Sequence, residues 1–114
     1  MHELGIMESA IGSVLAQARD HGARQVHRIV LRVGALSGVE PDALRFAFDV
    51  AAQNTPAAGA DLDIDTVPAR ARCGDCSLEF EVESGFIFSC PRCRQYCGNL
   101  LQGRELELTR IEMS

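Results

Sequence analysis

The chain has 114 residues, 46% of them apolar, so it should fold as one small domain or as a domain carrying an insert. Its formal net charge is −5 and its basic residues form no clustered run, which argues against binding to nucleic acid or anionic lipid. No segment is long and apolar enough to span a membrane, and the first residues lack the features of a signal peptide. We therefore expect a cytoplasmic protein, in which cysteines are more often metal ligands or reactive thiols than disulfides.

The first third of the chain predicts a helix followed by a strand. Apolar residues recur at helical spacing from Leu4 to Ala18. His21 and Gly22 would end that helix, since a histidine suits the negative end of the helix dipole and a glycine suits the position after the cap. The alternating residues 27–33 predict a strand with one buried face.

A second helix and two more strands are predicted further along. Pro41 suits the first turn of a helix, and the polar stretch 53–56 would stop it. Alternation predicts strands at 61–65 and 104–113, whereas residues 68–72 read as a connector.

All five cysteines lie between the last two predicted strands, and four of them form two C-x-x-C pairs. The pairs are Cys73 with Cys76 and Cys90 with Cys93. Each two-residue gap lets a tight turn aim both sulfurs at one point, and two such turns complete a tetrahedron that suits Zn²⁺. The residues between the pairs alternate over 78–83 and could form a hairpin, with a turn at 84–85 and a return strand at 86–88.

These patterns predict an α+β fold: two helices packed on a small mixed three-stranded sheet, with an inserted zinc-ribbon-like module. We expect residues 1–68 plus 104–114 to form the α+β domain, and the last strand to rejoin the first sheet. Residues 69–103 would form the zinc-binding module.

Two other uses of the cysteines stay open at this point. Iron could occupy the same knuckles, as in rubredoxin-like electron carriers, although the spacing between the pairs is short for that. Cys97 lies outside the two pairs; it could be a spare ligand or a reactive thiol, but four sulfurs already close a tetrahedral site. Its role is not determined by the sequence.

The N-terminus offers a second kind of metal site. The free amine of Met1, the amides of His2 and Glu3 and the His2 imidazole are four nitrogens that could lie in one plane. Square-planar nitrogen ligation suits Ni²⁺ or Cu²⁺ rather than Zn²⁺. A histidine near a terminus is more often simply solvated, and His21 and His27 are better explained as structural residues. The acidic triplet Asp61, Asp63 and Asp65 lacks the glycine and glutamate of a calcium loop.

The combination of these features resembles the HypA/HybF family of hydrogenase nickel-incorporation proteins. The resemblance rests on Met1-His2-Glu3 opening an amphipathic helix, on the two C-x-x-C pairs, on the stretches 32–37, 39–41 and 46–49, and on the closing Ile111-Glu112. It covers essentially the whole chain.

The resemblance implies a non-enzymatic nickel metallochaperone that helps insert Ni(II) into [NiFe]-hydrogenase, and some members also serve urease. It implies His2 as the nickel ligand with the backbone nitrogens of residues 1–3, and a structural Zn(II) on Cys73, Cys76, Cys90 and Cys93. Expected partners are the accessory GTPase of hydrogenase maturation (HypB) and the hydrogenase large-subunit precursor, without nucleic acid or membrane insertion.

A different class of function fits the cysteines alone. A zinc-ribbon adaptor that binds protein or nucleic acid would need no nickel site. The net negative charge disfavours the nucleic-acid form of that alternative. The sequence does not say which nickel enzyme is served, what the oligomeric state is, or what triggers nickel release.

Overall fold

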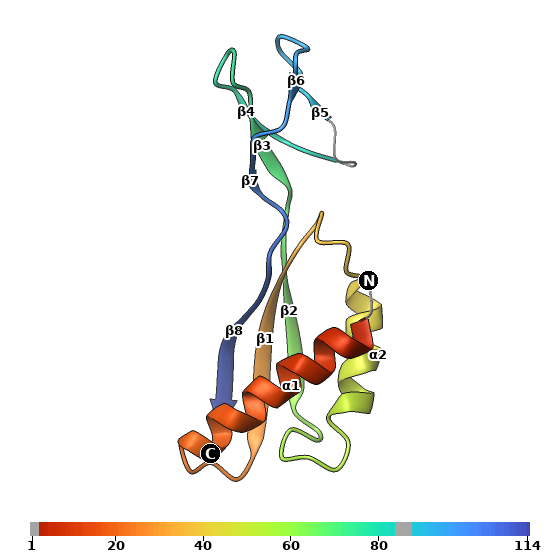
Figure 1. The fold of residues 1–114 in the computed structure, drawn as a ribbon, viewed down its shortest axis with the longest axis vertical. Helices are drawn as coiled ribbons and strands as arrows, with labels where there is room; N and C mark the ends of the chain where they lie inside the picture. Colours follow the sequence, from red (N-terminus) through yellow and green to blue (C-terminus); the bar gives the residue numbers. More distant parts are fainter. Residues whose placement is uncertain (1–2, 84–87) are drawn as a thin grey trace. The chain divides into compact units, whose positions relative to one another are not determined.

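The computed structural model describes residues 3–83 and 88–114, and the chain divides into two compact units (Figure 1). The first unit comprises Met1–Arg32, Val39–Asp65 and Glu107–Ser114. The second comprises Val33–Gly38 and Thr66–Leu106. Each unit is described separately below.

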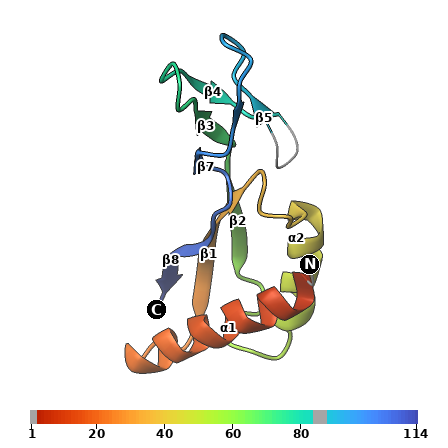
Figure 2. The same ribbon diagram turned by 45° about the horizontal axis from the view of Figure 1, so that its top comes forward.

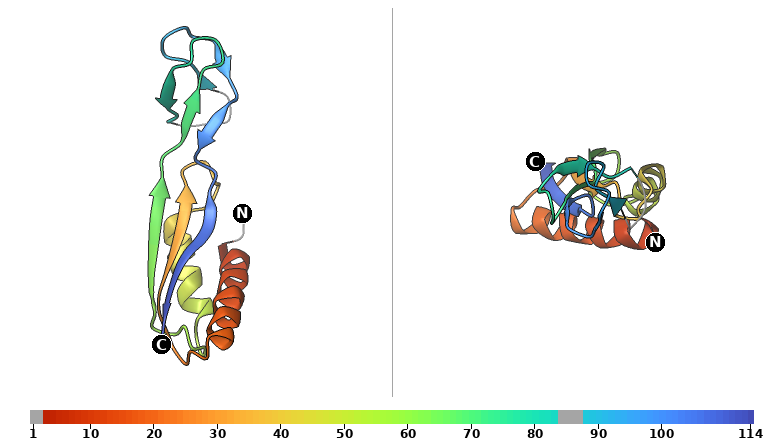
Figure 3. Two further views of the ribbon diagram at one scale, coloured as in Figure 1. Left: turned by 90° about the vertical axis from the view of Figure 1, so that its left-hand side faces the viewer. Right: turned by 90° about the horizontal axis from the view of Figure 1, so that it is seen from above.

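Two helices and most of three strands build the first unit. Helices α1 (Glu3–Asp20) and α2 (Pro41–Ala51) lie on one face of a sheet with strand order β2 (Asp61–Val67), β1 (Val26–Gly34), β8 (Leu106–Met113). Figure 3 shows β1 and β2 pointing the same way and β8 pointing the opposite way, so the sheet is mixed. The predicted α+β fold, with two helices on a mixed three-stranded sheet, is confirmed.

The core of the first unit forms because each helix buries one stripe and β1 buries alternate residues. The stripe of α1 recurs every three or four residues, as helical geometry requires, and β1 contributes every second side chain from Ile29 onward. Within the first unit, the fully or nearly fully buried residues of these three elements are Met7, Ile11, Val14, Ala18, Val26, Ile29, Leu31, Leu44, Ala47 and Phe48. In the described parts of the chain, every buried side chain other than those of Cys73 and Cys90 is apolar.

The ends of both helices are fixed by local hydrogen bonds. Gly22, with φ of +67°, follows α1; its N–H donates to the Arg19 carbonyl at 3.1 Å, and the Ala23 N–H donates to the Ala18 carbonyl at 2.8 Å. This pair of bonds is a Schellman motif, as the predicted glycine stop requires. At the start of α2 the Glu40 side chain accepts from the Asp42 N–H at 3.3 Å, and Pro41 occupies the first turn.

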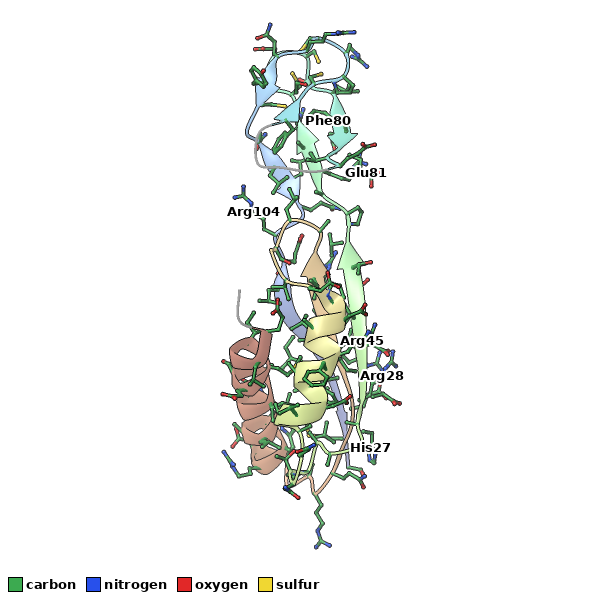
Figure 4. The ribbon with its side chains drawn as sticks, turned by 90° about the vertical axis from the view of Figure 1, so that its right-hand side faces the viewer. His27, Arg28, Arg45, Phe80, Glu81 and Arg104 are labelled. Atoms are coloured by element: carbon green, nitrogen blue, oxygen red, sulfur yellow. The ribbon has the colours of Figure 1, made fainter. Side chains whose placement is uncertain are left out.

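An ion-pair cluster joins the three strands of the first unit. Arg28 on β1 donates to Asp63 on β2 and, at 3.2 Å, to Glu112 on β8. All three side chains are 38–44% exposed, so solvent screens the cluster and its contribution to stability is small. Arg28 is labelled in Figure 4.

The second unit is a set of short strands. Strand β3 (Arg70–Arg72) pairs antiparallel with both β4 (Glu79–Glu81) and β7 (Leu100–Gln102), and β5 (Phe88–Ser89) pairs with β6 (Tyr96–Cys97) (Figure 2). A small apolar cluster holds them together: Ala69, Ala71, Val82 and Phe88, with Leu36, Phe80, Cys97 and Leu100 packed against it. Phe80 and Phe88 meet edge to face, with ring centroids 6.4 Å apart.

One prediction about this second unit was wrong. Residues 68–72 were expected to be a connector, but they contain β3, which is held by partners on both sides. Residues 78–83 were expected to form a hairpin with a return strand at 86–88. Among the described residues, β4 pairs with β3, and Phe88 pairs with Cys97. Residues 86–87 and the predicted turn at 84–85 lie outside the described residues.

Two glycines allow a very close backbone approach within the second unit. A Cβ added at Gly34 would lie 2.2 Å from the carbonyl carbon of Gly103, and one added at Gly103 would lie 2.8 Å from the Cα of Ala69. Gly103 also has φ of +129°, which side chains rarely allow. The chain can therefore cross itself here only because both residues lack a side chain.

In residues 3–83 and 88–114, neither helix is long and apolar enough to cross a membrane.

Candidate metal centre

Two turns of the same construction position the four paired cysteines. In the first, the Cys73 N–H donates to the Leu78 carbonyl and the Ser77 N–H donates to the Cys73 carbonyl, at 2.9 and 3.0 Å. In the second, the Cys90 N–H donates to Gln95 and the Arg94 N–H to Cys90, at 2.9 and 2.8 Å. Both turns end in a residue with φ of +63°. Each turn therefore folds both of its sulfurs toward one point, which the C-x-x-C spacing predicts.

The four sulfurs converge on a single site. Cys73 and Cys93 Sγ atoms are 3.4 Å apart, those of Cys76 and Cys90 are 3.5 Å apart, and all four lie within 4.8 Å of one another. Zinc–sulfur bonds of about 2.3 Å at tetrahedral angles place sulfurs about 3.8 Å apart, so this donor set fits Zn²⁺. Figure 4 shows sulfur atoms gathered at one end of the second unit.

The surroundings of the sulfurs favour thiolates, but their crowding opposes full ionisation. Backbone N–H groups of Cys93 and Arg92 point at the Cys90 sulfur and lower its pKa to about 6. The backbone N–H groups of Cys76 and Asp75 likewise lower the pKa of Cys73. The pKa of Cys93 is raised to about 12: the Gln95 N–H acts to lower it, but the neighbouring Cys73 sulfur and burial outweigh that effect. A bound dication would remove this repulsion and let all four sulfurs ionise.

Burial makes the site closed. Cys73 and Cys90 are 2% and 0% exposed, and the other two ligands are half-buried. With four protein donors the tetrahedron is complete, which leaves no position for water or substrate. Such a site suits a structural ion.

Cys97 belongs to the apolar cluster of the second unit. It lies opposite Phe88 in the β5–β6 pair and is half-buried. Burial and the nearby sulfurs raise the pKa of its thiol, in contrast to Cys90. Among the described residues, the metal-type cluster contains the four paired cysteines and not Cys97.

The second predicted metal site falls mostly outside the described residues. Met1 and His2 are not among them. Glu3 is described: it opens α1, and its carboxylate accepts a hydrogen bond of 3.4 Å from the backbone N–H of Glu40, next to the start of α2. The residue that follows His2 is thus held at the point where both helices begin.

The other histidines and the acidic triplet do not form a metal site. The His21 ring lies 2.8 Å from the Gln17 carbonyl one turn earlier, and the His27 ring lies 2.6 Å from the Ser114 hydroxyl. Asp63 binds Arg28, and Asp61 and Asp65 are exposed. None of these residues joins the metal-type cluster found in the described chain.

Two features near Glu3 were not predicted from the sequence. One is the Glu40 N–H described above. The other is an exposed apolar groove beside Glu3 that contains Phe46. Phe46 does not belong to the buried stripe of α2, and a large aromatic residue outside that stripe is the signal that could have revealed it.

An α+β unit joined to a β unit with four converging cysteines defines a small metal-binding protein built around a closed zinc-type site. A sequence profile described as "Hydrogenase/urease nickel incorporation, metallochaperone, hypA" matches residues 1–113. The chain belongs to this HypA family.

Individual relatives agree with the family match over nearly full length. Hydrogenase maturation factor HypA of Chloroflexus aurantiacus is 44% identical over 112 residues, 98% of either chain. The protein of the same name from Acidithiobacillus ferrooxidans is 42% identical over 113 residues, 99% of either chain. The solution structure of the nickel metallochaperone HypA from Helicobacter pylori is similar, with a TM-score of 0.66 at 25% identity, covering 99% of this chain and 97% of that one.

Proposed function

We propose that this protein is a nickel metallochaperone that binds Ni(II) at its N-terminus and helps insert it into [NiFe]-hydrogenase during maturation. The observation that carries the proposal is the family match over residues 1–113, which takes in both the N-terminal triplet and the four cysteines. Urease is named in the same family description, so it is the second nickel enzyme that the protein could serve.

The nickel ligands in this proposal are the Met1 amine, the backbone nitrogens of His2 and Glu3, and the His2 imidazole. Four nitrogens in a plane are a favoured environment for Ni²⁺. The bond between the Glu3 carboxylate and the Glu40 N–H supports the assignment, because it anchors Glu3, the last of the three residues that form the chelate. The ion stays at a chain end, where a receiving protein can reach it.

The second metal in the proposal is a structural Zn(II) on Cys73, Cys76, Cys90 and Cys93. The sulfur geometry supports it, since all four atoms lie within 4.8 Å of one another. In this proposal, residues 1–68 plus 104–114 form the domain that binds nickel, and residues 69–103 form the module that zinc stabilises. The zinc ion stabilises the fold and takes no part in transfer.

The protein acts in the cytoplasm as a carrier and not as an enzyme. A closed tetrathiolate site has no open coordination position for catalysis, which supports this assignment. Its partners are the accessory GTPase HypB and the hydrogenase large-subunit precursor. The family name supports work within hydrogenase maturation, and nickel insertion requires a protein that receives the ion.

A nickel titration tests the proposal. Untagged protein should bind one Ni²⁺ per chain by isothermal titration calorimetry, and His2→Ala should abolish this binding. One extra residue ahead of Met1 should be about as damaging, because it converts the amine into an amide and displaces the terminus. His21→Ala and His27→Ala are the matched controls and should leave nickel binding unchanged, and zinc should remain bound in every variant.

Three results would count against the proposal. Tight binding by the N-terminally extended protein would refute the amine-anchored chelate. Nickel retained by His2→Ala would move the site elsewhere, and absence of nickel binding in the untagged protein would favour the zinc-ribbon adaptor.

A further inference from the structure

An apolar groove lies between the start of α1 and the outer side of α2 in the first unit. Its volume is about 440 Å³. The residues that line it are Glu3, Leu4, Ala43, Phe46, Ala47 and Val50. All but Glu3 are apolar, so the groove suits another apolar surface better than it suits water.

The side chains around this groove are unusually exposed for their type. Phe46 is 73% exposed, Val50 42% and Leu4 41%. Phe46 stands one helical turn from both Ala43 and Val50, so these side chains form a continuous patch along α2. A contiguous apolar patch rimmed by polar groups is typical of a protein-interaction site.

The rim of the groove is acidic. Asp42 and Asp49 are exposed and lie four residues before and three residues after Phe46, which places them on the same side of α2. Glu3 contributes a third carboxylate. The basic residue of this helix, Arg45, is directed elsewhere: its guanidinium donates to the Leu62 carbonyl on β2 at 3.1 Å (Figure 4). The groove therefore combines apolar contact with negative charge.

We infer that this groove is the docking surface for the protein that receives nickel from this chain, and that the receiver presents an apolar side chain surrounded by Lys or Arg. The apolar residue fits against Phe46 and Val50, and the basic residues complement Asp42 and Asp49. The inference rests on the proposed function, since Glu3 lines the groove and directly follows the proposed ligand His2. A receiver bound here would lie beside the ion.

Binding of the nickel-free hydrogenase large-subunit precursor tests this surface. The full chain with its native N-terminus is titrated with purified precursor in a calorimeter, and the double variant Phe46→Ser, Val50→Ser is compared. We expect at least a tenfold loss of affinity, because the variant removes the central apolar contacts of the interface. Leu101→Ser is the matched control: Leu101 is 46% exposed but belongs to the second unit, and its loss should change nothing.

A charge variant tests the acidic rim separately. Asp42→Lys with Asp49→Lys should slow association with the precursor at least tenfold at low salt. The wild-type rate should fall as salt is raised, and the variant's rate should not. Unchanged association in this variant would overturn the charge complementarity that the inference requires.

The remaining outcomes are also decisive. Full affinity of the Phe46→Ser, Val50→Ser variant for the precursor overturns the docking surface, as does failure of the wild-type chain to bind the precursor. Loss of binding only to the accessory GTPase, or loss only of self-association in analytical ultracentrifugation, assigns the groove to another occupant and overturns the inference. Nickel titration of the same variants separates the two proposals, because the groove variants should still bind one Ni²⁺ per chain.

Discussion

At the residue scale, the two proposed metal sites use different ligand atoms: side-chain sulfurs for zinc and mainly backbone nitrogens for nickel. The zinc ligands are side chains brought together by two backbone turns, in which N–H groups already stabilise the charged sulfur of Cys90. The proposed nickel ligands are mostly backbone nitrogens of the first three residues. The first kind of site depends on folding, whereas the second depends on an intact chain terminus.

Nickel binding should strengthen as pH rises. The Met1 amine, the His2 imidazole and two backbone amides must all lose protons to bind, so protons compete with the ion. The dissociation constant of untagged protein, measured by calorimetry between pH 6 and pH 8.5, should fall steadily. An affinity that does not depend on pH would mean that the ligands are not these nitrogens.

Cys97→Ser should leave the zinc content at one ion per chain. The four paired cysteines already provide a complete tetrahedron, and Cys97 packs in the apolar cluster opposite Phe88. The cost should be confined to packing, about 1 kcal/mol of unfolding free energy. Metal analysis by mass spectrometry gives the stoichiometry, and loss of half or more of the zinc would show that a ligand has been misassigned.

Gly34→Ala should destabilise the protein strongly. Its Cβ would stand 2.2 Å from backbone atoms of Gly103, and backbone cannot yield as a side-chain tip does. We expect a loss of about 2 kcal/mol or more of unfolding free energy, measured by urea unfolding. Gly12→Ala is the contrasting variant: nothing lies within 4 Å of its added Cβ in α1, so it should stabilise by up to about 1 kcal/mol. Equal effects of both substitutions would contradict the close crossing.

At the element scale, the sequence predicted the regular elements of the first unit and the two cysteine turns. The stripe from Met7 to Ala18 and the alternation in β1 are long enough for periodicity to identify them. The C-x-x-C spacing alone predicts a tight turn with both sulfurs on one side. The cysteine site could therefore be predicted even though the strands around it could not.

The short strands of the second unit could not be predicted in the same way. β3 has three residues and β5 two, too few to show a period. Their pairing is set by tertiary partners: β3 lies between β4 and β7, and β7 comes from thirty residues further along the chain. The exposed position of Phe46 was also not predicted. Helical periodicity identifies the buried face of α2, but it does not show which apolar residues lie exposed on the other faces.

Loss of a zinc ligand should unfold the second unit and leave most of the first unit folded. The apolar cluster of the second unit is small, so the metal supplies a large share of its stability. Cys73→Ser or Cys90→Ser should lose zinc and collapse the NMR dispersion of residues 69–103, while signals from α1 and α2 persist. Loss of both sets of signals together would show that the two units fold as one.

At the scale of the whole molecule, each unit has its own interior. The first is held by helices packed on a sheet, and the second by a few apolar side chains and the cysteine site. Because the units have separate interiors, the two proposed metals can differ in how long they stay bound: zinc stays with the folded second unit, and nickel is released to a partner. The exposed groove and Glu3 both belong to the first unit, and the four paired cysteines belong to the second.

The pairing of Arg70 with Gln102 shortens the loop that must close when β8 joins the sheet of the first unit. While the second unit is folded, the strands β2 and β8 are joined to that pair by two short segments, residues 68–69 and 103–105. When the unit unfolds, the same strands are separated by one flexible loop of 38 residues, 68–105. Closing the longer loop costs about 2 kcal/mol more in chain entropy, so a zinc ion that keeps the second unit folded would also raise the effective concentration of β8 at the edge of β1.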